Sequence, residues 1–218
     1  MRPELRPPWL LLDFGKDLRL IGWPVVGPAL GRARSVAWLQ VRNADLPPDR
    51  DPSAYFTERA AAAGVSFDAG LMTAADLRGF AIARRAGVSV VATGGLGNAE
   101  SVAPSTAVST PDKVARVGTI NAVAVIDQPL TLAAQIEAVS IVAEARTAAV
   151  MGFDLTMPDS ARPITGTGTD CILVAAIDSE NGLAHCGLHT SIGRALAEAT
   201  YESVQETCAS CLRTPSLR

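Results

Sequence analysis

The residues best suited to chemistry by type and spacing form the stretch Thr165–Asp170, which reads Thr-Gly-Thr-Gly-Thr-Asp. Its alternating glycines let the backbone approach a ligand closely and adopt positive φ. Its hydroxyls donate and accept hydrogen bonds, and Asp170 supplies an acceptor or a base. The continuously apolar segment Cys171–Ile177 predicts a buried strand directly after it. The stretch thus predicts a polar site on a rigid strand, although a glycine-rich strand entry with a threonine ladder explains the same residues.

This stretch does not match the common nucleotide-binding or hydrolase motifs. It lacks the Lys-Ser/Thr ending of a P-loop and the G-x-G-x-x-G spacing of a dinucleotide fold. The chain also has no G-x-S-x-G nucleophile elbow, so an α/β-hydrolase serine is not supported. If the protein cleaves an amide, the nucleophile is the hydroxyl of Thr167 or Thr169, or an activated water molecule, and the sequence does not separate these.

The two histidines, His185 and His189, offer a second kind of chemistry. Their spacing would suit a metal on a helix, but Gly187 lies between them and no H-E-x-x-H pattern occurs. We therefore predict no metal site. His189 is a candidate general acid or base beside Asp170, and a buried histidine with satisfied hydrogen bonds is the alternative.

The cysteines do not form a recognisable redox or zinc motif. Cys208 and Cys211 are separated by two residues near the end of a predicted helix, whereas a redox pair normally follows a strand at a helix N-terminus. A four-cysteine zinc site with Cys171 and Cys186 fits no known ligand spacing. We interpret the cysteines as free thiols of a reducing compartment, and we place the protein in the cytoplasm.

Composition excludes several classes of protein. The chain has 218 residues, 48% of them apolar, and a net charge of −3, which is typical of a globular domain and argues against nucleic acid binding. The longest apolar region, residues 130–153, is interrupted by Glu137, Glu144 and Arg146, so it predicts a buried helix and not a membrane span. Glu137 and Glu144 are seven residues apart and share a helix face.

The strands expected to position the site follow from apolar runs between turn signals. Trp9–Phe14 and Leu18–Ile21, joined by Gly15-Lys16-Asp17, predict a hairpin. Further strands are expected over Val36–Val41, Val88–Ala92 and Val114–Ile126. A small, polar segment between the last two, Ala99–Asp112, predicts a surface loop, and the sequence does not decide whether it closes over a substrate as a lid.

The helices follow from capping signals and periodicity. Asp51 as N-cap and Pro52 at the first helical position predict a helix that ends before Gly64. Further helices are expected over Ala75–Ala86, Leu132–Met151 and Ser191 to about Cys208. Paired strands with helices grouped after them predict one α+β domain over residues 1–218, with a mainly antiparallel sheet covered by helices. An open α/β sheet is the alternative.

Several segments together resemble the adenosylcobinamide amidohydrolase family of corrinoid-salvage enzymes. They occur in the family's order and span about residues 70 to 205, while the N-terminal third is compatible but less distinctive. The matching segments are Leu71–Ala75, Val91–Ala99, Gly118–Asn121, Ala143–Ala149, Thr165–Asp170 and Gly187–Gly193.

The resemblance implies hydrolysis of the amide that joins the aminopropanol arm to the corrin ring, giving adenosylcobyric acid. It implies no consumed cofactor, because the corrinoid is the substrate and its cobalt belongs to the ligand. We expect no nucleic acid or membrane partner, and we leave a homo-oligomer open. The alternative function is a non-catalytic corrinoid- or nucleotide-binding module on the same scaffold.

A substrate fringed with amides would need many neutral hydrogen-bonding groups and a few groups for proton transfer. We assign these roles by inference and carry over no established catalytic residue from the family. The candidates for catalysis are Asp170, His189, Thr169 and Glu144. The candidates for substrate binding are Asn43, Thr93, Gly95, Asn98, Asn121, Thr165, Gly166, Thr167, Gly168 and Thr190.

The chain departs from the family pattern at two positions where we expect lysine, Arg146 and Ser191. If a lysine there orients a phosphorylated substrate, the preference for such a substrate is in doubt. The chain also lacks the D-x-H-x-x-G signature of proteins that ligate corrinoid cobalt through histidine. We therefore do not expect His185 or His189 to ligate cobalt.

Overall fold

The computed structural model describes residues 1–104, 118–158 and 160–213. Its strands are β1 (Arg2–Arg6), β2 (Trp9–Gly22), β3 (Leu30–Gln40), β4 (Ala69–Thr73), β5 (Ala81–Arg85), β6 (Val88–Gly94), β7 (Ala99–Glu100), β8 (Ile120–Leu130), β9 (Gly166–Thr167) and β10 (Cys171–Asp178). Its α-helices are α1 (Pro52–Ala63), α2 (Leu132–Met151) and α3 (Ser191–Arg213). Short 3₁₀ turns lie at Asn43–Asp45, Leu77–Gly79 and Leu96–Asn98.

Eight of the described strands form one mixed sheet. Its order is β4-β3-β2-β10-β8-β6-β5, and β1 pairs with the first part of β2. Among the described strands of this sheet, five neighbouring pairs are antiparallel, and two, β3–β4 and β8–β10, are parallel. The predicted α+β fold with a mainly antiparallel sheet covered by helices is therefore confirmed.

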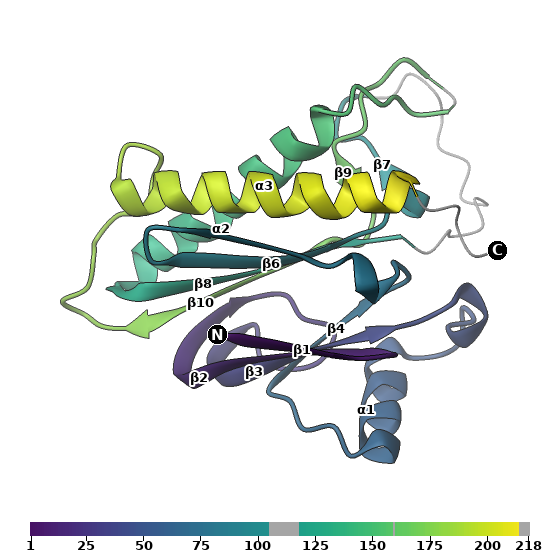
Figure 1. Cartoon of the computed structure of the whole chain (residues 1–218), viewed down its shortest axis with the longest axis horizontal. Coiled ribbons are helices and arrows are strands. Elements are labelled where there is room, and N and C mark those ends of the chain that lie inside the picture. The colour runs from purple at the N-terminus through teal and green to yellow at the C-terminus, as the bar shows by residue number, and fades with distance from the viewer. Residues whose placement is uncertain (105–117, 159, 214–218) are drawn as a thin grey trace.

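The core lies in layers on both sides of this sheet. Figure 1 shows β6, β8 and β10 stacked over β1 to β4, with α2 and α3 on the outer side of the first group and α1 against the second. Leu12 and Trp38 of the lower group and Val123 and Leu173 of the upper group belong to one buried cluster. Phe56 of α1 is fully buried in a separate cluster. Each layer removes apolar surface from water, which is the main stabilising term of such a fold.

The helix ends lie where their capping residues predict. Asp51 accepts a hydrogen bond from the backbone N–H of Ala54 at 2.7 Å, and Pro52 begins α1. Gly64 ends that helix in the left-handed conformation, with φ of 64°. The N-cap of α2 is Thr131. The predictions for α1 and α2 are therefore confirmed, and α3 begins at Ser191 as expected but continues to Arg213.

The predicted N-terminal hairpin is wrong. Trp9–Phe14 and Leu18–Ile21 belong to one strand, β2, whose pairing with β3 continues on both sides of the intervening residues. The register shifts between Asp13 and Leu18, and Gly15 has φ of 78°. The glycine therefore sits in a bulge that bends the strand without reversing it, because β3 supplies hydrogen-bonding partners along the whole length.

The predicted helix over Ala75–Ala86 is also wrong. Its residues form the 3₁₀ turn Leu77–Gly79 and the strand β5. Ala86 and Gly87 both have positive φ, 35° and 83°, so they make a tight turn that pairs β5 with β6. Gly87 is thus part of a hairpin turn and not a helix stop.

The remaining strand predictions agree with the described residues. Val36–Val41, Val88–Ala92 and Cys171–Ile177 fall on β3, β6 and β10, apart from one residue at the end of β3. The first residues of the expected strand Val114–Ile126 lie outside the described ranges. Gly118 and Thr119 precede β8, and the rest of the expected strand is in β8. Most of the expected loop Ala99–Asp112 also lies outside them, and so does the question of a lid. The first two residues of this segment form β7.

The four cysteines, all within the described residues, are free thiols, as predicted. Burial raises the pKa of Cys208 to about 12, whereas Cys211 is only partly buried. Because the thiolate is the reacting form, we expect a thiol reagent at pH 8 to label one cysteine quickly in the folded protein and four in denaturant. Cys211→Ser should remove the fast phase, and two fast thiols would contradict this burial pattern.

Candidate functional site

Three glycine-rich loops meet at one end of the sheet. They are the β6 loop (Gly94–Asn98), the β8 loop (Gly118–Asn121) and the β10 loop (Thr165–Asp170). The N–H of Gly95 donates to the carbonyl of Thr119 at 3.0 Å, and the N–H of Gly168 donates to the carbonyl of Asn98 at 3.1 Å. The short strands β7 and β9 also pair, which joins the end of the β6 loop to the β10 loop. The structure thus brings together most of the residues selected from the sequence.

The close contacts between these loops require glycine at specific positions. A Cβ atom on Gly118 would lie 2.5 Å from the backbone nitrogen of Asn98 and 2.6 Å from that of Gly97. A Cβ atom on Gly166 would lie 2.7 Å from a carboxylate oxygen of Asp170. All three distances are shorter than non-bonded contacts allow. The glycines therefore let the protein's own groups approach each other.

The carboxylate of Asp170 is the centre of the site. One oxygen, Oδ2, accepts from a terminal nitrogen of Arg146 at 2.6 Å and from the N–H of Thr167 at 3.0 Å. The other, Oδ1, accepts from the N–H of Ile120 at 2.8 Å and from the hydroxyl of Thr167. The side chain of Asp170 is 5% exposed and that of Arg146 is 17% exposed. This buried ion pair joins α2, β8 and the β10 loop.

The hydroxyl beside this carboxylate is that of Thr167, not that of Thr169. Thr169 is exposed, and its hydroxyl donates to the carbonyl of Gly118 at 3.3 Å. We had placed Thr169 among the catalytic candidates and Thr167 among the binding groups. A hydroxyl that donates to a buried carboxylate is the arrangement that activates it as a nucleophile, so the geometry favours Thr167 for the catalytic position.

The polar floor of the site connects the two halves of the sheet. Asn121 is fully buried, and its amide donates to the carbonyl of Met72 at 2.8 Å. The hydroxyl of Thr119 lies 3.3 Å from the side-chain oxygen of Asn121 and 2.8 Å from the carbonyl of Thr169. Thr93 pairs with Asn121 across β6 and β8, and its buried hydroxyl has no partner among the described residues. Asn121 thus has a structural task besides any contact with substrate.

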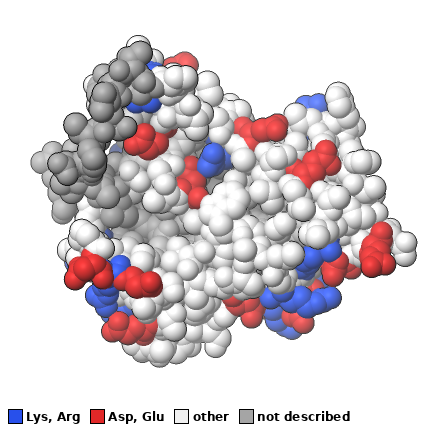
Figure 2. Space-filling model, turned by 180° about the vertical axis from the view of Figure 1, so that it is seen from behind, with Lys and Arg blue, Asp and Glu red and all other residues white. Residues whose placement is uncertain are grey.

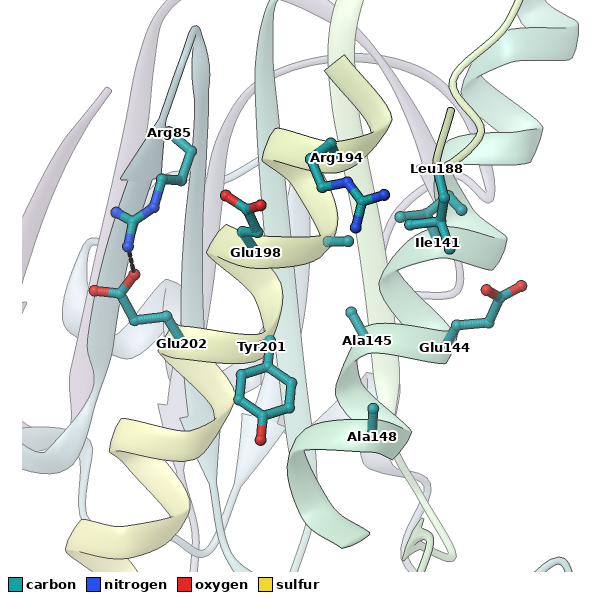
Figure 3. Close-up of a pocket in the computed structure, with 11 residues that line it drawn as sticks. Arg85, Ile141, Glu144, Ala145, Ala148, Leu188, Arg194, Glu198, Tyr201 and Glu202 are labelled. Atoms are coloured by element: carbon teal, nitrogen blue, oxygen red, sulfur yellow. Dashed lines mark hydrogen bonds and ion pairs between the residues drawn. The ribbon is translucent and has the colours of Figure 1, made fainter. Parts of the chain in front are cut away.

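Glu144, a catalytic candidate, does not lie among the glycine-rich loops. It is exposed on α2 and lines a groove of about 610 Å³ between α2 and α3. Figure 3 shows Ile141, Ala145 and Ala148 along this groove, with the Glu144 carboxylate directed away from α3. The helix turn that carries Glu144 therefore presents it to a different surface from Arg146.

His189 and Thr190 lie at the far end of α3 from the loops. The C-terminal part of α3 contacts the β6 loop, since a Cβ atom on Gly94 would meet Thr207 and Cys208. From Ser191 to Cys208 the helix rises about 25 Å, at 1.5 Å per residue. The structure therefore does not bring His189 to Asp170, and the expected acid–base pair between them is not formed.

The segment Gly187–Gly193 instead builds the start of α3. The hydroxyl of Thr190 accepts a hydrogen bond from the N–H of Gly193 at 3.0 Å. A Cβ atom on Gly193 would lie 2.1 Å from the carbonyl oxygen of Gly187, so only glycine fits where the helix crosses the preceding chain. Glu137 accepts from the N–H of Cys186 at 2.6 Å. These contacts show that the segment caps and anchors the N-terminus of α3.

Asn43 lies in the 3₁₀ turn after β3, on the lower half of the sheet, and is exposed. The neighbouring Val41 donates its N–H to the carbonyl of Thr73 at the end of β4. Asn43 therefore follows the strand that pairs with β4 at the sheet edge where Asn121 contacts Met72. Among the candidates for substrate binding, Thr190 is the one placed at the far end of α3 from the junction of the three loops.

A family model described as adenosylcobinamide amidohydrolase matches residues 2–215. The chain belongs to the adenosylcobinamide amidohydrolase family. It is accordingly an enzyme that acts on an amide bond. A search of curated proteins finds no match. The resemblance inferred from six segments is confirmed, and it extends over the N-terminal third as well.

The described residues contain neither a metal-ligand cluster nor a helix that could span a membrane. Within residues 1–104, 118–158 and 160–213, no group of three or more His, Cys, Asp or Glu side chains is arranged to hold a metal ion. None of the helices in the described part of the chain has the length and hydropathy needed to cross a membrane.

Arg146 and Ser191, the two departures from the expected lysines, have different surroundings. Arg146 binds the carboxylate of Asp170, so a cation at this position is part of the ion pair that holds the site together. Ser191 is the first residue of α3, at the end remote from the loops.

Asp170→Asn should destabilise the fold, because it leaves the buried Arg146 charge without its counter-ion. Breaking a buried pair in this way costs about 3–5 kcal/mol. Chemical denaturation would measure the free energy of unfolding, with Asp49→Asn on an exposed turn as the control, expected to stay within about 0.5 kcal/mol of wild type. A loss for Asp170→Asn as small as the control's would contradict the central role of the pair.

Thr190→Ala should cost about 1 kcal/mol of stability through loss of the helix cap. Thr190→Ser keeps the accepting oxygen and should retain most of that stability. Thermal unfolding of the two variants beside wild type tests this, and equal losses for serine and alanine would show that the hydroxyl does not cap α3.

Proposed function

We propose that the protein hydrolyses the amide bond that joins the aminopropanol arm to the corrin ring of adenosylcobinamide, giving adenosylcobyric acid and aminopropanol. The observation that carries this proposal is the Thr167 hydroxyl held on the buried carboxylate of Asp170 at the junction of three loops. Membership of the amidohydrolase family supplies the reaction class. The reaction allows a scavenged corrinoid to re-enter the cell's cobamide pathway, and we place it in the cytoplasm.

The proposed chemistry runs through an ester of Thr167. Its hydroxyl oxygen attacks the amide carbonyl carbon while Asp170 Oδ1 accepts the hydroxyl proton. The C–N bond then breaks, and the aminopropanol nitrogen leaves with that proton. A water molecule then attacks the ester carbon and gives a proton to Asp170. The ester C–O bond breaks, Asp170 returns the proton to the Thr167 oxygen, and the corrinoid carboxylic acid is released. Backbone N–H groups of the loops would stabilise the oxyanion, each by about 3 kcal/mol.

The surroundings suit a large substrate whose periphery is made of neutral amides. The loops carry Asn98, Thr165 and Thr169, which both donate and accept hydrogen bonds. Figure 2 shows the molecule from behind, where an acidic and a basic group lie side by side near the middle and the surface beside them is uncharged. An uncharged surface avoids the desolvation cost that charged groups would impose on an amide-rich ligand.

Thr167→Val keeps the shape of the side chain but removes the hydroxyl, so we expect turnover of adenosylcobinamide to fall by about 10³-fold or more. Thr167→Ser should retain measurable activity, and Thr57→Val, an exposed threonine of α1, should remain close to wild type. Chromatography with mass detection of adenosylcobyric acid gives the rates, and unfolding curves show that the variants are folded.

Other outcomes of this experiment separate the alternatives. Activity retained in Thr167→Val would favour an activated water molecule over the hydroxyl. If wild type binds adenosylcobinamide and returns it unchanged, the non-catalytic binding module is the better description. His189→Ala tests the histidine independently, since loss of turnover in a folded variant would assign it a role despite its distance from Asp170.

A further inference from the structure

Trp23 is placed directly beside the candidate site. Of the three tryptophans, all within the described residues, Trp9 and Trp38 are buried, whereas Trp23 is 45% exposed. Its indole N–H donates to the backbone carbonyl of Asp170 at 2.7 Å. The ring of Trp23 is therefore fixed in orientation by the same residue whose carboxylate holds Thr167.

The backbone before Trp23 passes so close to β10 that only glycine fits at position 22. The N–H of Trp23 lies 3.3 Å from the carbonyl of Ile172, and Gly22 before it has φ of 149°. A Cβ atom on Gly22 would lie 2.0 Å from that carbonyl oxygen. The N–H of Gly22 also donates to the carbonyl of Ala29 at 2.9 Å, which closes the loop behind the tryptophan. The backbone contacts with β10 and Ala29 thus fix the position of Trp23.

Trp23 forms one side of an exposed apolar depression of about 350 Å³, here called the apolar shelf. Leu30 and Ile136 are 52% and 54% exposed, which is unusual for large apolar side chains gathered in one place. Every residue of the shelf is within the described ranges, and none is charged. The shelf consists of Ile21, Gly22, Trp23, Ala29, Leu30, Ile136 and Val139.

The shelf continues along α2 to the buried ion pair. Ile136, Val139, Ala143 and Arg146 are spaced by three or four residues and so lie on one helix face. The helix rises about 15 Å from Ile136 to Arg146. A ligand that extended from Ile136 to the ion pair would need to be large, and a small amide would cover only one end of this path.

We propose that the apolar shelf binds the flat macrocycle of the substrate, with Trp23 stacked on the ring, while the amide arm reaches Thr167. This inference rests on the proposed function and specifies how a large planar substrate is recognised. Ligand sites combine apolar and aromatic walls with a few fixed polar groups, and an aromatic ring fixed in place loses little entropy on binding. The hydrogen bond from Trp23 to Asp170 makes shelf and site continuous.

The test compares KM and kcat for adenosylcobinamide across variants of the shelf. Trp23→Ala should raise KM about tenfold with kcat within about twofold of wild type, because it removes binding shared by ground state and transition state. Trp23→Phe keeps a stacking ring and should change KM by less than about threefold, which separates stacking from the hydrogen bond. Ile136→Ser should raise KM, and Leu183→Ala, an exposed leucine outside the shelf, should change neither constant.

A lower kcat with unchanged KM in both Trp23 variants would overturn the proposal, because Trp23 would then act through Asp170 alone. If wild type is active and KM is unchanged in Trp23→Ala and Ile136→Ser, the proposal that the shelf binds the macrocycle is wrong, while the proposed hydrolysis is not contradicted. A dimer of wild type that Ile136→Ser converts to monomer, measured by light scattering, would also overturn it, since a second copy would cover the shelf.

Equilibrium dialysis with adenosylcobinamide distinguishes failure of the shelf from failure of the reaction. If wild type binds without producing acid and Trp23→Ala binds about tenfold more weakly, the shelf is supported and the proposed hydrolysis is wrong. If wild type neither binds nor converts this corrinoid, both proposals are wrong.

Discussion

The arrangement of the site depends on one buried carboxylate and the donors around it. Water cannot solvate the side chain of Asp170 at 5% exposure, so protein groups must replace the water. Within the described residues these donors come from Arg146 of α2, Ile120 of β8 and Thr167 of the β10 loop. A helix, a strand and a loop distant in sequence are therefore held in one arrangement, because moving any of them away would leave a charge buried without a partner.

The glycines around this carboxylate follow from the same constraint. Gly118, Gly166 and Gly168 leave space that Asn98 and Asp170 occupy, at distances where a methyl group would not fit or would force its neighbours to shift. The pattern that suggested close approach of a ligand thus also serves close approach within the protein. These contacts within the protein account for the glycines as a glycine-rich strand entry. That the same stretch is a catalytic site stays a prediction, and it rests on the hydroxyl of Thr167.

Local signals predicted the elements that local interactions determine. Asp51, Thr131 and the apolar strand after Asp170 lie where their types imply, since a cap or a buried run needs only its neighbours. Gly15 and Gly87 were misread because a bulge and a hairpin turn depend on which strand pairs alongside. The distance between His189 and Asp170 depends on the direction and length of α3, and the Arg146 pair on how α2 packs, so neither followed from spacing in the sequence.

The pairing of β2 with β10 connects the proposed recognition surface and the proposed nucleophile through one residue, Asp170. The indole N–H of Trp23 donates to the carbonyl of Asp170, and the hydroxyl of Thr167 donates to its carboxylate. A ligand stacked on Trp23 would thus be positioned relative to Thr167 by two hydrogen bonds to one residue. Binding energy from a remote part of a substrate can be used to orient the bond that reacts. An enzyme that must select one amide among the many on a corrinoid needs such an external reference, because the amides resemble each other chemically. A macrocycle held between Trp23 and Ile136, which lies about 15 Å along α2 from Arg146, would supply it, by allowing only one arm to reach the hydroxyl.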